Sequence, residues 1–138
     1  TLESRPLADL LMEPTRIYVK PLLEVMLDFD IHALAHITGG GLTENLPRVL
    51  PPNTAARIDL NSWTLPPVFS WLAGKGPIEP LELLRTFNCG VGMTLIAAPG
   101  QVSGIAKALS TAGETVFEIG TIISGERGDV IYDGELML

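Results

Sequence analysis

Residues 93–123 read MTLIAAPGQVSGIAKALSTAGETVFEIGTII, and this stretch decides the fold class. Met93–Ala98 is a short apolar run ended by a Pro-Gly pair, so we expect a strand there. Gln101–Thr111 carries apolar residues at helical spacing, and Gly113 lies where a helix commonly ends. Val116–Ile123 is a second apolar run with the length of a strand. This strand-helix-strand unit predicts a sheet with helices packed against it.

Shorter elements surround this unit on both sides. We expect helices over residues 7–12, 21–29, 43–49, 66–72 and 80–86, and strands over residues 31–37 and 56–60. Thr43 is predicted to cap its helix through the hydroxyl group. After a turn over residues 125–129, residues 130–132 and 135–138 are expected to form a terminal hairpin. The mixture of short helices and strands predicts an α+β fold rather than a doubly wound one.

The composition limits the classes of partner. A chain of 138 residues with 46% hydrophobic residues has the size of one domain with a real core. A formal net charge of -7 argues against nucleic acid, because phosphate backbones are held by clustered Lys and Arg. A small phosphate could still be bound locally, and the candidate side chains are Arg16, Arg48 and Arg85. We find no apolar run long enough to cross a membrane.

The single cysteine and the first residues bear on location. Cys89 excludes an internal disulfide, and its apolar surroundings favour a buried structural thiol over a nucleophile. No charged and then apolar leader precedes Leu2, so we expect a cytoplasmic location. The chain begins with Thr1 rather than Met, which suggests a piece of a longer polypeptide.

The first candidate site is the segment HITGGGLTEN, residues 36–45. Gly39–Gly41 can present backbone N–H groups at the start of a helix, and such groups favour an anion. The alternative is a tight turn between strand and helix that binds nothing. His32 and His36 are spaced like a helical zinc pair but lack the adjacent glutamate, so we expect no metal site. His36, at the strand end, either meets a ligand or bonds to nearby backbone.

The second candidate site is the segment RTFNCGVGM, residues 85–93. Asn88 offers both a donor and an acceptor, and the glycines at 90 and 92 allow a close approach to the backbone. Arg85 can pair with a phosphate or satisfy carbonyl groups at the end of a helix. The alternative is a turn with a polar cap.

Three motifs together are more specific than either site alone. They are PTRIYVK at residues 14–20, HITGGGLTENLPRVL at residues 36–50 and RTFNCGVGM at residues 85–93. In sequence and order they resemble the C-terminal domain of the phosphoribosylformylglycinamidine cyclo-ligase family, also called aminoimidazole ribonucleotide synthetase. The resemblance runs through essentially the whole chain. Related ATP-binding enzymes, including selenophosphate synthetase and thiamine-monophosphate kinase, share the architecture but have less similar motifs.

The resemblance implies a fold, a reaction and a set of partners. The fold is a three-layer α/β/α arrangement with a mixed sheet, partly ferredoxin-like. Residues 1–138 would be the single C-terminal domain, lacking its first strand and helix, with the ATP-binding N-terminal domain absent. The full enzyme is a cytoplasmic homodimer that uses ATP and Mg²⁺ to close the ring of formylglycinamidine ribonucleotide. It yields aminoimidazole ribonucleotide, ADP and phosphate. We expect this fragment alone to be inactive and to bind no cofactor.

The resemblance also implies roles for particular residues. His36 and Asn88 would be catalytic, with Asn88 fixing the reacting amide and His36 orienting or protonating an oxygen. The residues implied in binding the substrate or its phosphate are Thr38, Gly39, Gly40, Gly41, Glu44, Asn45, Arg48, Arg85, Gly90 and Gly92. Two alternatives stay open: a stand-alone, non-catalytic domain that binds a phosphorylated metabolite, and a fragment of one of the related kinases or synthetases.

Overall fold

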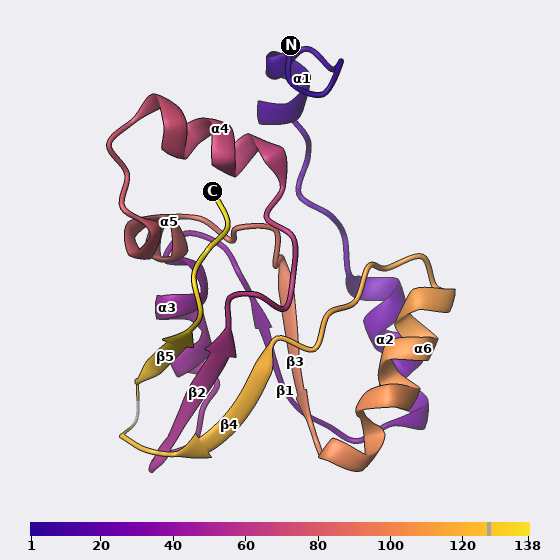
Figure 1. The fold of residues 1–138 in the computed structure, drawn as a ribbon. Helices are drawn as coiled ribbons and strands as arrows, with labels where there is room; N and C mark the ends of the chain where they lie inside the picture. The colour runs from indigo at the N-terminus through magenta and orange to yellow at the C-terminus, as the bar shows by residue number, and fades with distance from the viewer. Residues whose placement is uncertain (127) are drawn as a thin grey trace.

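The computed structural model describes residues 1–126 and 128–138, and its elements are short (Figure 1). The helices are α1 (Leu7–Leu11), α2 (Val19–Asp28), α3 (Gly41–Asn45), α4 (Pro67–Lys75), α5 (Pro80–Thr86) and α6 (Val102–Thr111). The strands are β1 (Ile31–His36), β2 (Thr54–Asp59), β3 (Met93–Ala97), β4 (Gly120–Ser124) and β5 (Val130–Asp133). Short 3-10 turns cover Leu46–Arg48 and Pro99–Gln101. Among the described residues, no helix is both long and apolar enough to span a membrane.

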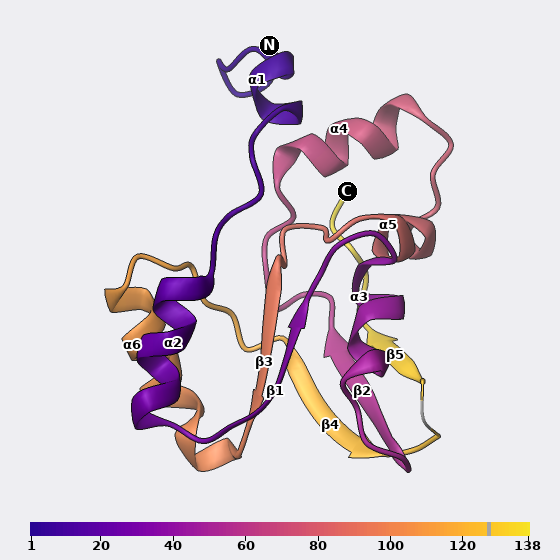
Figure 2. The ribbon, with the colours of Figure 1, turned by 180° about the vertical axis from the view of Figure 1, so that it is seen from behind.

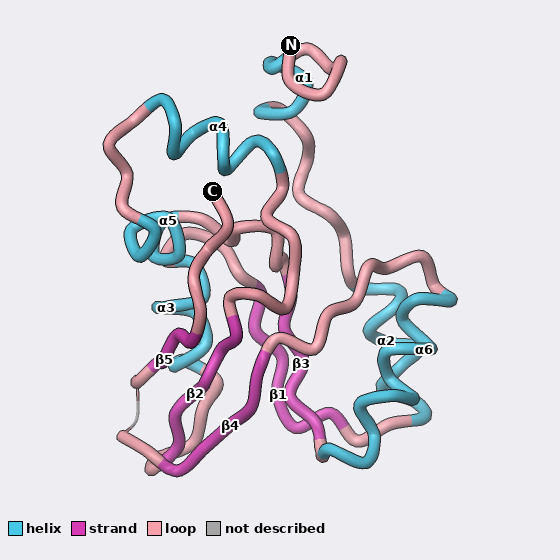
Figure 3. Tube along the Cα trace, in the orientation of Figure 1, coloured by secondary structure: helices cyan, strands magenta, loops and turns pink. Residues whose placement is uncertain are grey.

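The strands form two small sheets (Figure 3). β1 and β3 are antiparallel, with His36 opposite Met93. In the other sheet β2 is central, antiparallel to β4 and parallel to β5. Helices α2 and α6 lie side by side on one flank of the strands, and α3 and α5 lie on the other (Figure 2). The predicted α+β class with a mixed sheet is confirmed, although the strands are divided between two sheets.

The larger hydrophobic core forms between the strands and the helices α3 and α5. Leu42 of α3 and Leu83 and Leu84 of α5 are completely buried. Trp63 also belongs to this core, and its indole Nε1 donates a hydrogen bond of 3.0 Å to the carbonyl oxygen of Cys89. Each of the leucines contributes about 1.5–3 kcal/mol by burial, so the position of α5 against α3 is strongly determined. A second cluster joins α2 to α6 through Val25, Ile105 and Leu109.

The strand-helix-strand unit has the predicted elements but a different pairing. β3 and β4 flank α6 in sequence, yet β4 pairs with β2 rather than with β3. Gly120, the first residue of β4, allows this pairing, because a Cβ there would collide with the carbonyl oxygen of Arg57. The strand that we expected from Val116 therefore starts at Gly120, and Phe117 is exposed. A glycine at the start of the strand therefore makes room for the neighbouring strand.

The predicted terminal hairpin is wrong. β5 pairs in parallel with β2, with Ala56 opposite Val130, and residues 134–138 form no strand. Gly134 turns the chain with φ +81°, and Leu136 then enters the core. Burial of this leucine outweighs the few hydrogen bonds of a short hairpin, which is marginal in isolation. Of the predicted turn over residues 125–129, residue 127 lies outside the described residues.

The predicted capping role of Thr43 is also wrong. Gly40, with φ +99°, precedes α3, and Thr43 lies within the helix. The Thr43 hydroxyl donates to the carbonyl oxygen of Leu84 at 3.4 Å and lies 2.8 Å from the hydroxyl oxygen of Tyr132. Burial raises the pKa of Tyr132, while the bond with Thr43 partly offsets this rise. Leu84 belongs to α5 and Tyr132 to β5, so Thr43 connects α3 to both of these elements.

Candidate functional site

The two candidate segments meet at the carboxyl end of β1. Because β1 and β3 are antiparallel, the end of the first strand lies beside the start of the second. The N–H group of Ile37 donates a hydrogen bond of 2.9 Å to the carbonyl oxygen of Gly92, just beyond the paired strands. The glycine-rich segment after His36 and the segment from Asn88 to Gly92 are therefore neighbours in space.

The glycine loop is shaped largely by packing. Gly41 has φ +56°, and a Cβ on it would collide with the carbonyl oxygen of Leu84. Its N–H group donates to the carbonyl oxygen of Thr38 at 3.0 Å, which closes the turn. A Cβ on Gly40 would lie 2.8 Å from the Glu44 carboxylate, whereas one on Gly39 would have no atom within 4 Å. Gly39 is therefore the position of this loop that leaves open space.

Asn45 supports the glycine loop from inside. Its side chain is buried, and Nδ2 lies within hydrogen-bond distance of three carbonyl oxygens: Gly41 at 2.8 Å, Gly39 at 3.2 Å and Thr38 at 3.3 Å. The two hydrogens of the amide are shared among these acceptors. Asn45 therefore holds the loop in shape rather than facing solvent.

The exposed rim of the loop carries an ion pair. Arg85 Nε lies 3.2 Å from Glu44 Oε1, and both side chains are largely exposed. Such a pair contributes at most about 1 kcal/mol, so a ligand can displace it at little cost. Thr38 is exposed on the same loop.

The segment after α5 is a tight turn around Asn88. The N–H group of Gly90 donates to Asn88 Oδ1 at 3.0 Å, and that of Val91 donates to the Asn88 carbonyl oxygen at 2.9 Å. Gly90 has φ +93°, and a Cβ on it would lie 2.6 Å from Cδ of Pro66. Within the described part of the chain, Asn88 Nδ2 donates to no acceptor, so this group is available to a ligand.

Tyr18 joins the third motif to both segments, and sequence reasoning missed it as a site residue. Its ring meets the His36 ring edge-on, with centroids 6.0 Å apart and an interplanar angle of 74°. Its hydroxyl oxygen occupies the position that a Cβ on Gly92 would take. The available signal was its place within PTRIYVK, a motif from which we had named Arg16 alone as a candidate residue.

Two of the candidate arginines lie away from the glycine loop. Arg16 Nε donates to Glu114 Oε2 at 2.7 Å, and its Nη2 donates to the carbonyl oxygen of Gly113 at 3.0 Å. Arg16 thus ties the N-terminal segment to the end of α6. Arg48 is exposed at the end of a 3-10 turn and lines a groove between the two sheets.

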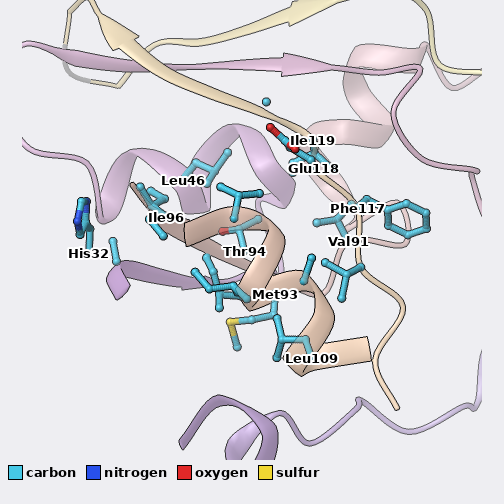
Figure 4. Close-up of a pocket in the computed structure, with 18 of the residues that line it drawn as sticks. His32, Leu46, Val91, Met93, Thr94, Ile96, Leu109, Phe117, Glu118 and Ile119 are labelled. Carbon is cyan, nitrogen blue, oxygen red and sulfur yellow. The ribbon is translucent and has the colours of Figure 1, made fainter. Parts of the chain in front are cut away.

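This groove has a volume of about 1470 Å³ and is mainly apolar (Figure 4). Met93, Thr94 and Ile96 of β3 lie on one side, and the segment with Phe117 and Ile119 borders the other. Tyr18, Gly90 and Gly92 also line it, whereas the glycine loop does not. The second segment therefore borders the groove, and the glycine loop does not.

The two histidines do not act as a pair. His32 lies at one end of the groove, with Nε2 3.6 Å from Asp30 Oδ2, while His36 contacts Tyr18. The pairing of β1 with β3 is irregular between Ile31 and Ala33, so the regular alternation of side chains along β1 is disturbed at His32.

Comparison with known proteins places the chain in a family. The family model described as "AIR synthase related protein, C-terminal domain" matches residues 1–133. The chain belongs to this family. The AIR synthase related domain also resembles the crystal structure of thiamine-monophosphate kinase from Stenotrophomonas maltophilia K279a, with a TM-score of 0.57 and 22% identity. The match covers 79% of this chain and 33% of that one, so the domain spans about a third of that kinase.

Within the AIR synthase related domain, the candidate residues form two connected groups. Thr38, Gly39, Glu44 and Arg85 lie at the exposed loop, and Gly90 and Gly92 border the groove. His36, with Tyr18 against it, lies at the strand end between them. Cys89 is completely buried, and burial raises the pKa of its thiol to about 12, so a thiolate nucleophile does not form there at neutral pH.

Proposed function

We propose that this chain is the C-terminal domain of a phosphoribosylformylglycinamidine cyclo-ligase. The observation that carries the proposal is the meeting of three motifs at one place: Tyr18 contacts His36 and covers Gly92, beside the glycine loop. Arg85 joins the same place through Glu44. Packing of the core does not require exposed polar side chains and an uncovered backbone position to lie together at the end of one strand. Their grouping therefore supports a ligand site.

In the proposed reaction, ATP phosphorylates the amide oxygen of formylglycinamidine ribonucleotide, and the amidine nitrogen then attacks the activated carbon. Phosphate leaves, and the imidazole ring of aminoimidazole ribonucleotide is closed. The free Nδ2 of Asn88 would donate to the reacting amide, and His36 would orient or protonate an oxygen. The open backbone at Gly39, with Arg85 released from Glu44, would hold the substrate phosphate.

The remaining parts of the active site would come from elsewhere. ATP and Mg²⁺ would be held mainly by an N-terminal domain of the same enzyme, which would act as a cytoplasmic homodimer. Of the three candidate arginines, only Arg85 lies at the glycine loop, and a single arginine suits one phosphate group rather than a triphosphate. We therefore expect the chain by itself to bind neither ATP nor Mg²⁺.

The first test compares the isolated chain with the same chain joined to an ATP-binding N-terminal domain. Each is incubated with ATP, Mg²⁺ and formylglycinamidine ribonucleotide, and release of aminoimidazole ribonucleotide is measured. We expect turnover only from the joined protein. Product from the isolated chain would overturn its predicted inactivity. Phosphorylation of thiamine monophosphate in place of ring closure would assign the chain to a kinase.

A second test changes His36 to Ala in the joined protein. Removing a positioned acid-base group is expected to lower kcat roughly tenfold to a hundredfold. The melting temperature should change little, because the His36 side chain is exposed. His32→Ala is the matched control, since His32 is exposed on the same strand but contacts Asp30. Unchanged kinetics in a normally stable His36→Ala protein would remove His36 from the site.

A further inference from the structure

Tyr18 occupies a position that connects three segments of the chain. It immediately precedes α2, and its carbonyl oxygen accepts a hydrogen bond of 3.1 Å from the N–H group of Leu22, which places its backbone at the first turn of that helix. Its side chain then extends from the helix start to the end of β1 and the start of β3. The start of α2 therefore fixes the backbone from which the aromatic ring projects.

The Tyr18 ring contacts the ring of His36. His36 ends β1, and its exposed side chain meets the Tyr18 ring edge-on, with the ring centroids 6.0 Å apart. Edge-to-face pairs of this kind favour one mutual orientation, because the electron-rich face of one ring attracts the positive edge of the other. An exposed histidine without this contact would be free to rotate between several rotamers.

The hydroxyl group of Tyr18 explains why residue 92 is glycine. A Cβ on Gly92 would collide with the Tyr18 hydroxyl oxygen, so the missing side chain makes room for tyrosine. Tyr18 is half-buried there, and burial, together with the nearby Glu114 carboxylate, raises its pKa. The phenol therefore stays neutral at physiological pH.

We propose that Tyr18 is a positioning residue that fixes the orientation of the His36 imidazole, and that Gly92 exists to admit it. The inference rests on the proposed function for the role of His36. In this arrangement Tyr18 would not itself contact the reacting atoms. Its effect passes through the histidine ring, which distinguishes it from a residue that merely fills the groove.

The contact is tested first by NMR on the chain itself. The Tyr18 ring current should shift the His36 ring protons away from their free positions, and Tyr18→Leu should remove that shift. Tyr18→Phe, which keeps the ring, should retain it. The ring protons of His32 are the internal control, because the His32 ring lies beside Asp30 and forms no ring contact with Tyr18 in the described part of the chain. His36 resonances that do not respond to Tyr18→Leu would overturn the proposal.

Function is tested by a double-mutant cycle in the protein joined to its ATP-binding domain, with whichever substrate it consumes. Tyr18→Leu should lower kcat by about two- to tenfold, the range that one aromatic pair is worth, with KM little changed. Tyr18→Phe should recover most of that loss. In the His36→Ala background, Tyr18→Leu should have no further effect. Val19→Ala, at an exposed neighbouring position, is the control.

The outcomes separate this inference from the proposed function. Equal losses from Tyr18→Leu with and without His36 would show that Tyr18 does not act through the histidine, even if the enzyme closes the ring. If the joined protein consumed another substrate and closed no ring, the proposed function would be refuted, but the double-mutant cycle could still be measured with that substrate.

The Gly92→Ala variant should lose activity as Tyr18→Leu does, because the added Cβ would collide with the Tyr18 hydroxyl oxygen. Adding Tyr18→Phe should restore activity, because phenylalanine lacks this hydroxyl group.

Discussion

Gly41→Ala is expected to lower the free energy of unfolding by about 3 kcal/mol or more, because two costs add. Gly41 has φ +56°, a left-handed conformation that costs an alanine about 1–2 kcal/mol. The new Cβ would also collide with the carbonyl oxygen of Leu84 and lie 2.7 Å from that of Phe87. Both are backbone atoms at the end of α5, and the complete burial of Leu83 and Leu84 prevents that helix from shifting.

Urea unfolding measures this effect as a shift of the midpoint at constant slope. Gly39→Ala is the matched control, because a Cβ there would have no atom within 4 Å and its backbone is not left-handed. It should change stability by no more than about 0.5 kcal/mol. If the two variants were equally stable, the close packing of the glycine loop on α5 would be incorrect.

Asn45→Asp is expected to lower the free energy of unfolding by about 3 kcal/mol at pH 7, and Asn45→Ala by somewhat less. Asn45 Nδ2 lies between three carbonyl oxygens at 2.8–3.3 Å. Alanine leaves these acceptors without their donor. A carboxylate adds repulsion, because it can only accept and would lie against them in a buried site.

Asn88→Asp is the contrasting control, since the same substitution there keeps the interaction. Asn88 accepts through Oδ1 from the N–H group of Gly90, and a carboxylate accepts equally well. We expect its stability to change by less than about 0.5 kcal/mol. The Asn45→Asp defect should shrink as the pH falls, because a protonated carboxyl group regains one donor. Equal stability of the two variants at pH 7 would contradict the role assigned to Asn45.

Local chemistry predicted most element positions well. The helix over Pro80–Thr86 has the predicted bounds, because proline suits its first turn and the apolar residues repeat at helical spacing. The strands near Ile31 and Met93 likewise begin where expected, since short apolar runs are bounded by polar residues or turns. Signals of this kind lie within a few residues of the element they determine.

Strand pairing was not predictable in the same way. β4 pairs with β2, and Gly120 leaves room for the carbonyl group of Arg57. β5 pairs in parallel with β2, and Leu136 after it enters the core. The alternating pattern of a strand specifies its faces and leaves its neighbour undetermined. The neighbour is chosen by burial and backbone contact between residues that are distant in the chain.

The candidate site likewise has features that were predictable from the sequence and features that depend on tertiary contacts. The sequence by itself determined the α+β class, most helices and strands, and the three motifs that meet at the end of β1, because apolar spacing, prolines and glycines act locally. Only the tertiary structure decided what fills the space at each glycine: α5 at Gly41, Glu44 at Gly40 and Tyr18 at Gly92. It also decided that Asn45 donates inward and that Thr43 bonds to Tyr132. The physical reason is that a missing side chain or a polar group acquires its role from its partner, and a compact core brings that partner from far along the chain.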